Sequence, residues 1–260
     1  MRMMIFILLV IMSCGRESPT QKSEKISNAI TTKQVNSLLQ KKQFELKVYF
    51  ESNAKPEFGN FHDSSLSYWN LAQTNIERLL LNHYKTPDIF IPQKEEEVTS
   101  LPSFEMDEWD NKRANKKIKP LIAQAEKDGQ TAYLHVFFVN GKWKKEKTEE
   151  GVKVLGVSMV TANYILIFKD SMMDFSKDQN MLAFIEQRSM IHEIAHSLGL
   201  VNRGIKMQRY HEDPDHEHHC SNPKCLLYWM NDAVESYTYF LSHPVDIFFG
   251  EECLSDIDHF

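Results

Sequence analysis

The chain has 260 residues, a formal net charge of −6, and 42% hydrophobic against 25% charged residues. An acidic chain of this kind argues against nucleic acid as a main partner. Its length is enough for one domain with a sizeable core. Beyond the N-terminal segment, no apolar run is long enough to span a membrane.

Residues 1–13 form a short apolar segment, which is too short for a membrane-spanning helix and predicts a signal peptide. Residues 11–15, Ile-Met-Ser-Cys-Gly, resemble a bacterial lipobox. This implies that Cys14 is lipidated and anchors the protein to a membrane outside the cytoplasm, in a bacterial cell envelope. An ordinary signal with a chance cysteine is the alternative. The polar residues 14–42 predict a flexible tether, which leaves 43–260 as the folded domain.

Hydrophobic periodicity predicts a mixed, twisted sheet with helices, which is an α+β fold. The expected strands are 44–50, 87–92, 131–139, 152–160 and 164–168, with 131–139 central. The expected helices are one from Ser64 or Ser65 to about Tyr84, one at 107–127, and one at 181–198. We expect His135 to be a packed core histidine and 95–97 to be a solvated acidic face.

The most informative motif is His192-Glu193-x-x-His196-x-x-Gly199. On a helix, residues four apart lie on one face, so His192 and His196 can share one zinc ion. Glu193 can then reach a water on that ion, and Gly199 suits a left-handed residue that ends the helix. Apolar neighbours predict that this helix is buried. A solvated helix with incidental histidines is the alternative.

A catalytic zinc needs a third protein ligand. The order of segments resembles the metzincin clan of zinc peptidases: a strand-rich half comes first, then the H-E-x-x-H motif, and then an irregular half. This resemblance implies an N-terminal subdomain at 43–200 and a small irregular C-terminal subdomain at 201–260. Metzincins carry the third ligand at the position that is Asn202 in this chain, and an amide is a weak zinc ligand.

The residues further downstream resemble the archaemetzincins, which carry a His-Cys pair, four residues, a second Cys and then x-Met. Here the block is His219-Cys220, four residues, Cys225-Leu226-Leu227. The resemblance implies that His219 is the third zinc ligand, that 201–218 is an insertion, and that Leu227 takes the Met-turn position. The chain is also similar to exported bacterial lipoproteins of metalloprotease type. The alternatives for the third ligand are His211, then His216, His218 and Asn202.

Three cysteines remain after Cys14. In an oxidising compartment we expect a disulfide between Cys220 and Cys225, with a bridge from one of them to Cys253 as the alternative. Archaemetzincins also hold a structural zinc on four cysteines, but the later C-x-x-C is missing here. The sequence therefore predicts one catalytic Zn²⁺, and it lacks the motif that would support a structural one.

The resemblance implies a zinc-dependent endopeptidase, monomeric and lipid-anchored, that acts on peptide or protein substrates. Its zinc-bound water would attack the peptide bond, with Glu193 as the general base. Tyr228 is a candidate donor to the oxyanion, or else a packed turn residue. The rival interpretation is a non-catalytic or degenerate zinc-binding lipoprotein, for which Glu193 would be dispensable.

Overall fold

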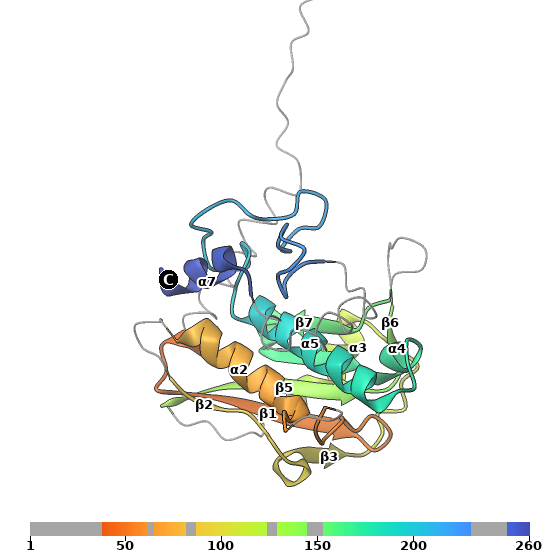
Figure 1. The fold of residues 1–260 in the computed structure, drawn as a ribbon. Coiled ribbons are helices and arrows are strands. Elements are labelled where there is room, and N and C mark those ends of the chain that lie inside the picture. Colours follow the sequence, from red (N-terminus) through yellow and green to blue (C-terminus); the bar gives the residue numbers. More distant parts are fainter. Residues whose placement is uncertain (1–37, 62–64, 82–86, 124–128, 145–152, 230–248) are drawn as a thin grey trace, which may run out of the picture.

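The computed structural model describes residues 38–61, 65–81, 87–123, 129–144, 153–229 and 249–260 (Figure 1). The predicted signal peptide, Cys14 and most of the predicted tether lie outside these residues. Among the residues that are described, no helix is both long and apolar enough to cross a membrane.

A twisted, mainly parallel sheet forms the centre of the fold, in the order β2-β1-β5-β8-β7. Only β7 runs antiparallel to its neighbour, and β3 pairs with the far half of β1 on the same side as β2. The strands are β1 (Gln43–Glu51), β2 (Asp88–Phe90), β3 (Thr99–Leu101), β5 (Thr131–Val139), β7 (Gly156–Met159) and β8 (Tyr164–Phe168). The expected mixed sheet and its central strand, β5 between β1 and β8, are confirmed.

Both faces of this sheet are covered, which explains why β5 reads as an almost unbroken apolar run. Leu134, Val136 and Phe138 point to the face on which α2 (Tyr68–Leu80) and α5 (Gln179–Ser197) lie side by side (Figure 1). Phe137 and Val139 point to the opposite face, against α3 (Asn111–Ala123). The fold is therefore α+β, with α5 packed directly on the sheet.

Two helix starts differ from the sequence prediction. α2 begins at Tyr68 and is capped by Ser67, whose side chain accepts a hydrogen bond from the backbone N–H of Asn70. Ser64 or Ser65 was the wrong cap, because Ser67 is held extended by its bridge to Asn60.

The helix expected at 107–127 begins only at Asn111. Residues Glu108–Trp109 form β4, which pairs with β6 (Lys142–Trp143), and this pairing keeps the backbone extended. The Asp110 side chain then accepts from the N–H of Arg113 in the first turn of α3. The strand expected at 152–160 is also shorter: β7 begins at Gly156, and Val160 already belongs to the 3₁₀ turn η2 (Val160–Ala162).

The remaining described elements are short. They are the exposed 3₁₀ turn η1 (Glu95–Glu97), α4 (Lys169–Met173) and the C-terminal helix α7 (Glu251–Asp258). α4 contributes Lys169, which is 4% exposed and pairs with Glu57 at 3.0 Å and with the fully buried Glu186 of α5. This buried charge network fixes α5 to the chain beside it.

His135 is a packed core histidine, as expected. Its side chain is 3% exposed, stacks on Tyr49, and has no hydrogen-bond partner for Nδ1 among the described residues. Burial, with a smaller effect from the charge of Lys47, lowers the pKa of His135 from 6.5 to about 4. The native protein therefore keeps this imidazole neutral over a range in which the unfolded chain takes up a proton.

This linkage predicts a contribution to acid sensitivity that His135→Leu removes, so the variant should lose less stability in acid than the wild type. Wild-type stability should fall as the pH drops from about 6.5 to 4, by up to about 3 kcal/mol at about 1.4 kcal/mol per pKa unit. Denaturant unfolding of both proteins at pH 7 and pH 4.5 measures the difference. Equal losses of the free energy of unfolding in the two proteins would contradict this account of His135.

Candidate metal centre and active site

The last turn of α5 sets two imidazoles against each other. His192 and His196 are one turn apart, and their Nε2 atoms are 3.0 Å from each other. The helix ends in a Schellman motif, in which Gly199 has a φ of 89°. The N–H of Gly199 bonds to the His196 carbonyl and the N–H of Leu200 to the Ala195 carbonyl. The expected role of Gly199 as the left-handed end of the helix is therefore confirmed.

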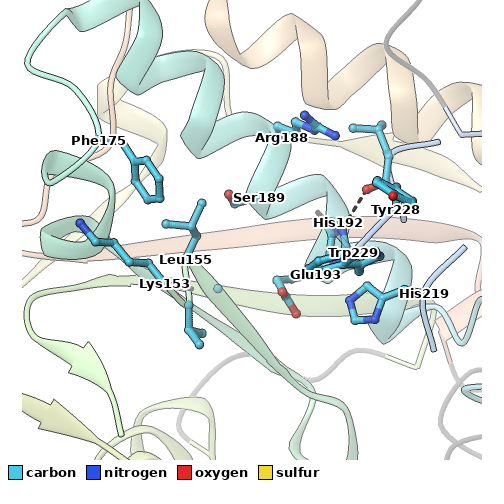
Figure 2. A pocket seen from close by; sticks show the side chains of 13 residues that line it. Lys153, Leu155, Phe175, Arg188, Ser189, His192, Glu193, His219, Tyr228 and Trp229 are labelled. Carbon is cyan, nitrogen blue, oxygen red and sulfur yellow. Dashed lines mark hydrogen bonds between the residues drawn. The ribbon is translucent and has the colours of Figure 1, made fainter. Parts of the chain in front are cut away.

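His219 comes from a later segment and completes a group of three. Its ring centroid lies 5.2 Å from that of His192 and 5.1 Å from that of His196. One nitrogen from each ring lies within 4.8 Å of the others. Figure 2 shows His192, Glu193 and His219 together at the pocket wall. The structure thus brings together the three residues that the sequence proposes as zinc ligands.

Backbone carbonyls orient two of these rings. His192 Nδ1 donates to the Leu226 carbonyl at 2.8 Å, and His219 Nδ1 donates to the Glu217 carbonyl at 3.0 Å. Each bond places the proton on Nδ1 and leaves the Nε2 lone pair free, as in known zinc sites.

The protonation states of the three histidines also suit metal binding. Burial lowers the pKa of His192 to about 3, and it lowers the pKa values of His196 and His219 as well. Three neutral imidazoles facing one point, with the pocket on the remaining side, match the donor set of a catalytic zinc that keeps one open position.

The other four candidates for third ligand are bonded elsewhere. His211, His216 and His218 do not belong to the group of histidines around His192, and the Asn202 amide is bonded to a carboxylate. Their partners are Glu212 for Asn202, Asp256 for His211, Asp213 for His216, and the Val201 carbonyl for His218. The geometry therefore supports His219 over each of these alternatives.

Glu193 lies against the edge strand β7. A Cβ at Gly156 would stand 2.8 Å from Glu193 Cγ, so the absence of a side chain there makes room for Glu193. Burial raises the pKa of the Glu193 carboxyl to about 7, opposed by the charge of Arg203 and by a backbone hydrogen bond from Ser158. The Ser158 hydroxyl also bonds to Ser197 at 2.7 Å, which ties β7 to α5.

Sequence reasoning missed Gly156, Ser158 and Arg203. The first two are unremarkable residues in a short strand, and only the pairing of β7 with α5 makes them part of the site. Arg203 follows the end of α5 and could have been noticed as a cation close to the motif. No periodic pattern marked any of the three.

A pocket of about 420 Å³ opens beside these residues. Apolar side chains such as Leu155 and Phe175 line it, with the cations Lys153 and Arg188 and the aromatic residues Tyr228 and Trp229 around them (Figure 2). Glu193, His192 and His219 thus line a cavity that is large enough for a side chain of a bound ligand.

The predicted Cys220–Cys225 disulfide is absent from the structure. Cys220, Cys225 and Cys253 are all buried free thiols. Neither the preferred bridge nor the alternative to Cys253 is formed. Cys220 and Cys253 lie in a group with His211, and the Cys225 sulfur is 3.6 Å from that of Cys253. His211 therefore belongs to a second cluster, separate from the three histidines.

The fold and the site together define a mixed α+β protein with a three-histidine centre at the end of a buried helix. No protein-family model matches the chain, and no similar curated protein is found. A zinc-dependent peptidase from Methanocorpusculum labreanum is a weak structural neighbour, with 14% identity and a TM-score of 0.43. The match covers 82% of this chain and 99% of that chain. A likeness at this level carries no functional argument, and the function must be inferred from the residues of the site.

The geometry predicts that His219→Ala binds one zinc ion fewer than the wild type. Losing one of three ligands should weaken zinc binding at this centre by at least about 100-fold, the upper end of what outer-shell partners cost. Zinc per chain, measured by elemental analysis after dialysis against a mild chelator, tests this prediction.

His218→Asn is the matched control. His218 has a φ of 66°, which asparagine tolerates, and its ring points to the Val201 carbonyl. This variant should keep the wild-type zinc content. Equal zinc in the wild type and His219→Ala would refute the assignment of His219.

Proposed function

We propose that this chain is a zinc-dependent endopeptidase of the metzincin type. The observation that carries the proposal is the convergence of three neutral imidazoles, His192, His196 and His219, with Glu193 beside them at the wall of a pocket. Peptide hydrolysis is the chemistry that this set of groups serves in metalloproteases.

Each group has a role in this reaction. Zinc held by the three histidines would lower the pKa of a water molecule and polarise the scissile carbonyl. Glu193 accepts the proton from the attacking water and returns it to the leaving amine. Gly156 leaves room for the Glu193 side chain, and the Ser158 N–H bonds to its carboxylate. Tyr228, which is half-buried in the pocket wall, is the candidate donor to the oxyanion.

The sheet supports a way of binding an extended peptide. β7 is the last strand of the sheet and, among the described strands, pairs only with β8. Its other edge offers backbone N–H and C=O groups next to Glu193, to which an extended substrate can add as a further strand. A substrate bound in this way passes the metal-facing histidines with its side chains alternating toward the pocket.

The archaemetzincin-like type is part of the same proposal. Supporting features are the glycine that ends α5, the His219-Cys220 pair after an insertion, and Leu227, fully buried at the Met-turn position, where an apolar packing residue is needed. We also propose that the protein is exported and anchored through lipidated Cys14, which the N-terminal sequence supports.

Replacement of the general base tests the proposal. Glu193→Gln should keep the wild-type zinc content and lose about 10² to 10⁴-fold in kcat/KM, because the amide cannot accept the proton. The assay is cleavage of unfolded casein carrying a quenched fluorophore. Hydrolysis that is unchanged in Glu193→Gln would refute Glu193 as the general base. No hydrolysis by the zinc-loaded wild type would favour the non-catalytic zinc-binding lipoprotein.

A second prediction concerns the glycine that faces this base. Gly156→Ala puts a methyl group 2.8 Å from Glu193 Cγ, so the carboxylate must move. We expect a loss of at least about 10-fold in kcat/KM at unchanged zinc content, since small misplacements of catalytic groups are costly. Gly129→Ala is the matched control, because a Cβ there meets nothing within 4 Å. Equal activity in the two variants would contradict the proposed place of Glu193.

A further inference from the structure

A second group of metal-binding side chains lies apart from the three histidines. His211, Cys220 and Cys253 are all buried, and one ligand atom from each lies within 4.8 Å of the others. The sulfur of Cys225 joins them at 3.6 Å from that of Cys253. The four residues come from three segments: the stretch after α5, the segment that carries His219, and helix α7.

The sulfurs are surrounded by backbone donors. The N–H groups of Leu227 and Gly250 point at Cys225 Sγ, at 3.4 and 3.2 Å. The N–H of Asn222 points at Cys220 Sγ at 3.5 Å. A neutral buried thiol is a weak acceptor and gains little from such bonds, whereas a metal-bound thiolate is stabilised by them.

The hydrogen bonds of His211 are those of a histidine that binds a metal. Its Nε2 donates to Asp256 Oδ2 at 2.8 Å, and Asp256, which is fully buried, also accepts from the N–H of Gln208 at 2.7 Å. Its Nδ1 is buried and has no hydrogen-bond partner among the described residues. A carboxylate on one ring nitrogen and a bare lone pair on the other is the usual arrangement of a zinc-ligating histidine.

We propose that His211, Cys220, Cys225 and Cys253 bind a second, structural zinc ion. Three thiolates and one imidazole are a common structural set for zinc, which takes four ligands tetrahedrally. Bonds of about 2.3 Å to sulfur place tetrahedral sulfurs about 3.8 Å apart, close to the observed 3.6 Å between Cys225 and Cys253.

This ligand set differs from the four cysteines that the archaemetzincin resemblance implies. The chain has three cysteines in this region, and His211 supplies the fourth ligand from the stretch that the sequence marks as an insertion. A disulfide would join two of the sulfurs at most, and it would leave the third cysteine and the Nδ1 of His211 unlinked to them. One zinc ion would bind all four side chains.

The position of this cluster gives it a structural role. Cys220 directly follows His219, and the Cys220 N–H bonds to the Leu227 carbonyl at 2.8 Å. The neighbouring Leu226 carbonyl orients His192. An ion here would join α7, which lies beyond the C-terminal end of α5 in Figure 1, to the segment that presents the third histidine. The second zinc would thus hold the first site in shape.

The test uses the full chain and Co²⁺ as a probe, because thiolate ligands give cobalt strong near-ultraviolet charge-transfer absorption and histidines alone do not. His219→Ala, whose three-histidine centre is incomplete, should still bind one Co²⁺ with these bands. The same protein with Cys253→Ser added should lose most of that intensity. Cys14→Ser, which removes the one cysteine outside the cluster, should leave the bands unchanged.

Two milder variants keep the test separate from folding. His211→Cys should retain the ion with stronger bands, whereas His211→Ala should release it. Asp256→Asn should lose zinc to a chelator about 10- to 100-fold more readily than the wild type, as expected for an outer-shell partner.

The proposal would be overturned if His219→Ala bound Co²⁺ without thiolate bands or bound none. A disulfide among the three cysteines, detected by mass spectrometry of the unreduced chain, would overturn it as well. Every readout is metal content or absorption, so the result is independent of whether the protein cleaves peptides.

Discussion

Three imidazole nitrogens can share one cation only if all three rings are neutral and their lone pairs point at the same place. Two of the rings, His192 and His196, come from successive turns of α5 and meet this condition through helix geometry alone. The third, His219, lies in irregular chain and must be positioned by its surroundings. Much of the C-terminal part of the structure can be understood as the means of placing that one ring.

The carbonyls of Leu226 and Glu217 set the tautomers of His192 and His219. Leu226 lies between Cys225 and Leu227. The Leu227 carbonyl accepts a hydrogen bond from the Cys220 N–H. A single segment therefore presents His219, orients His192 and carries two of the clustered cysteines. On the opposite side, β7 brings Gly156 and Ser158 against Glu193, and the hydroxyl bond between Ser158 and Ser197 keeps this strand on the helix.

The fold was largely predictable wherever periodicity was strong. β5 and β8 have the expected bounds, because buried parallel strands are continuous apolar runs, and α5 was expected from its motif and apolar neighbours. Local signals misplaced the starts of α2 and α3, because a bridge to Asn60 keeps Ser67 extended and pairing with the distant Lys142 keeps Glu108 extended. Such pairings are tertiary interactions that single-sequence patterns do not encode.

The residues of the site divide in the same way, into those that local spacing predicts and those that depend on packing. His192, Glu193 and His196 follow from spacing on one helix, and His219 followed only from a resemblance. The predicted disulfide is not formed in the structure. A sequence gives the number of cysteines, but it does not show that their side chains lie beside a buried histidine. Gly156 gave no signal, and Arg203 gave only that of a cation close to the motif. Their importance comes from lying beside Glu193, which depends on the packing of β7 and of the chain after α5.

The most direct measurement of the central claim is an anomalous difference map at the zinc edge from crystals grown with zinc. The account predicts a peak about 2.0 to 2.1 Å from the Nε2 atoms of His192, His196 and His219, the usual zinc–imidazole distance. Glu193 should lie beside this peak on its pocket side without binding it. No peak among the three rings, or a peak bound by other residues in place of His219, would contradict the account.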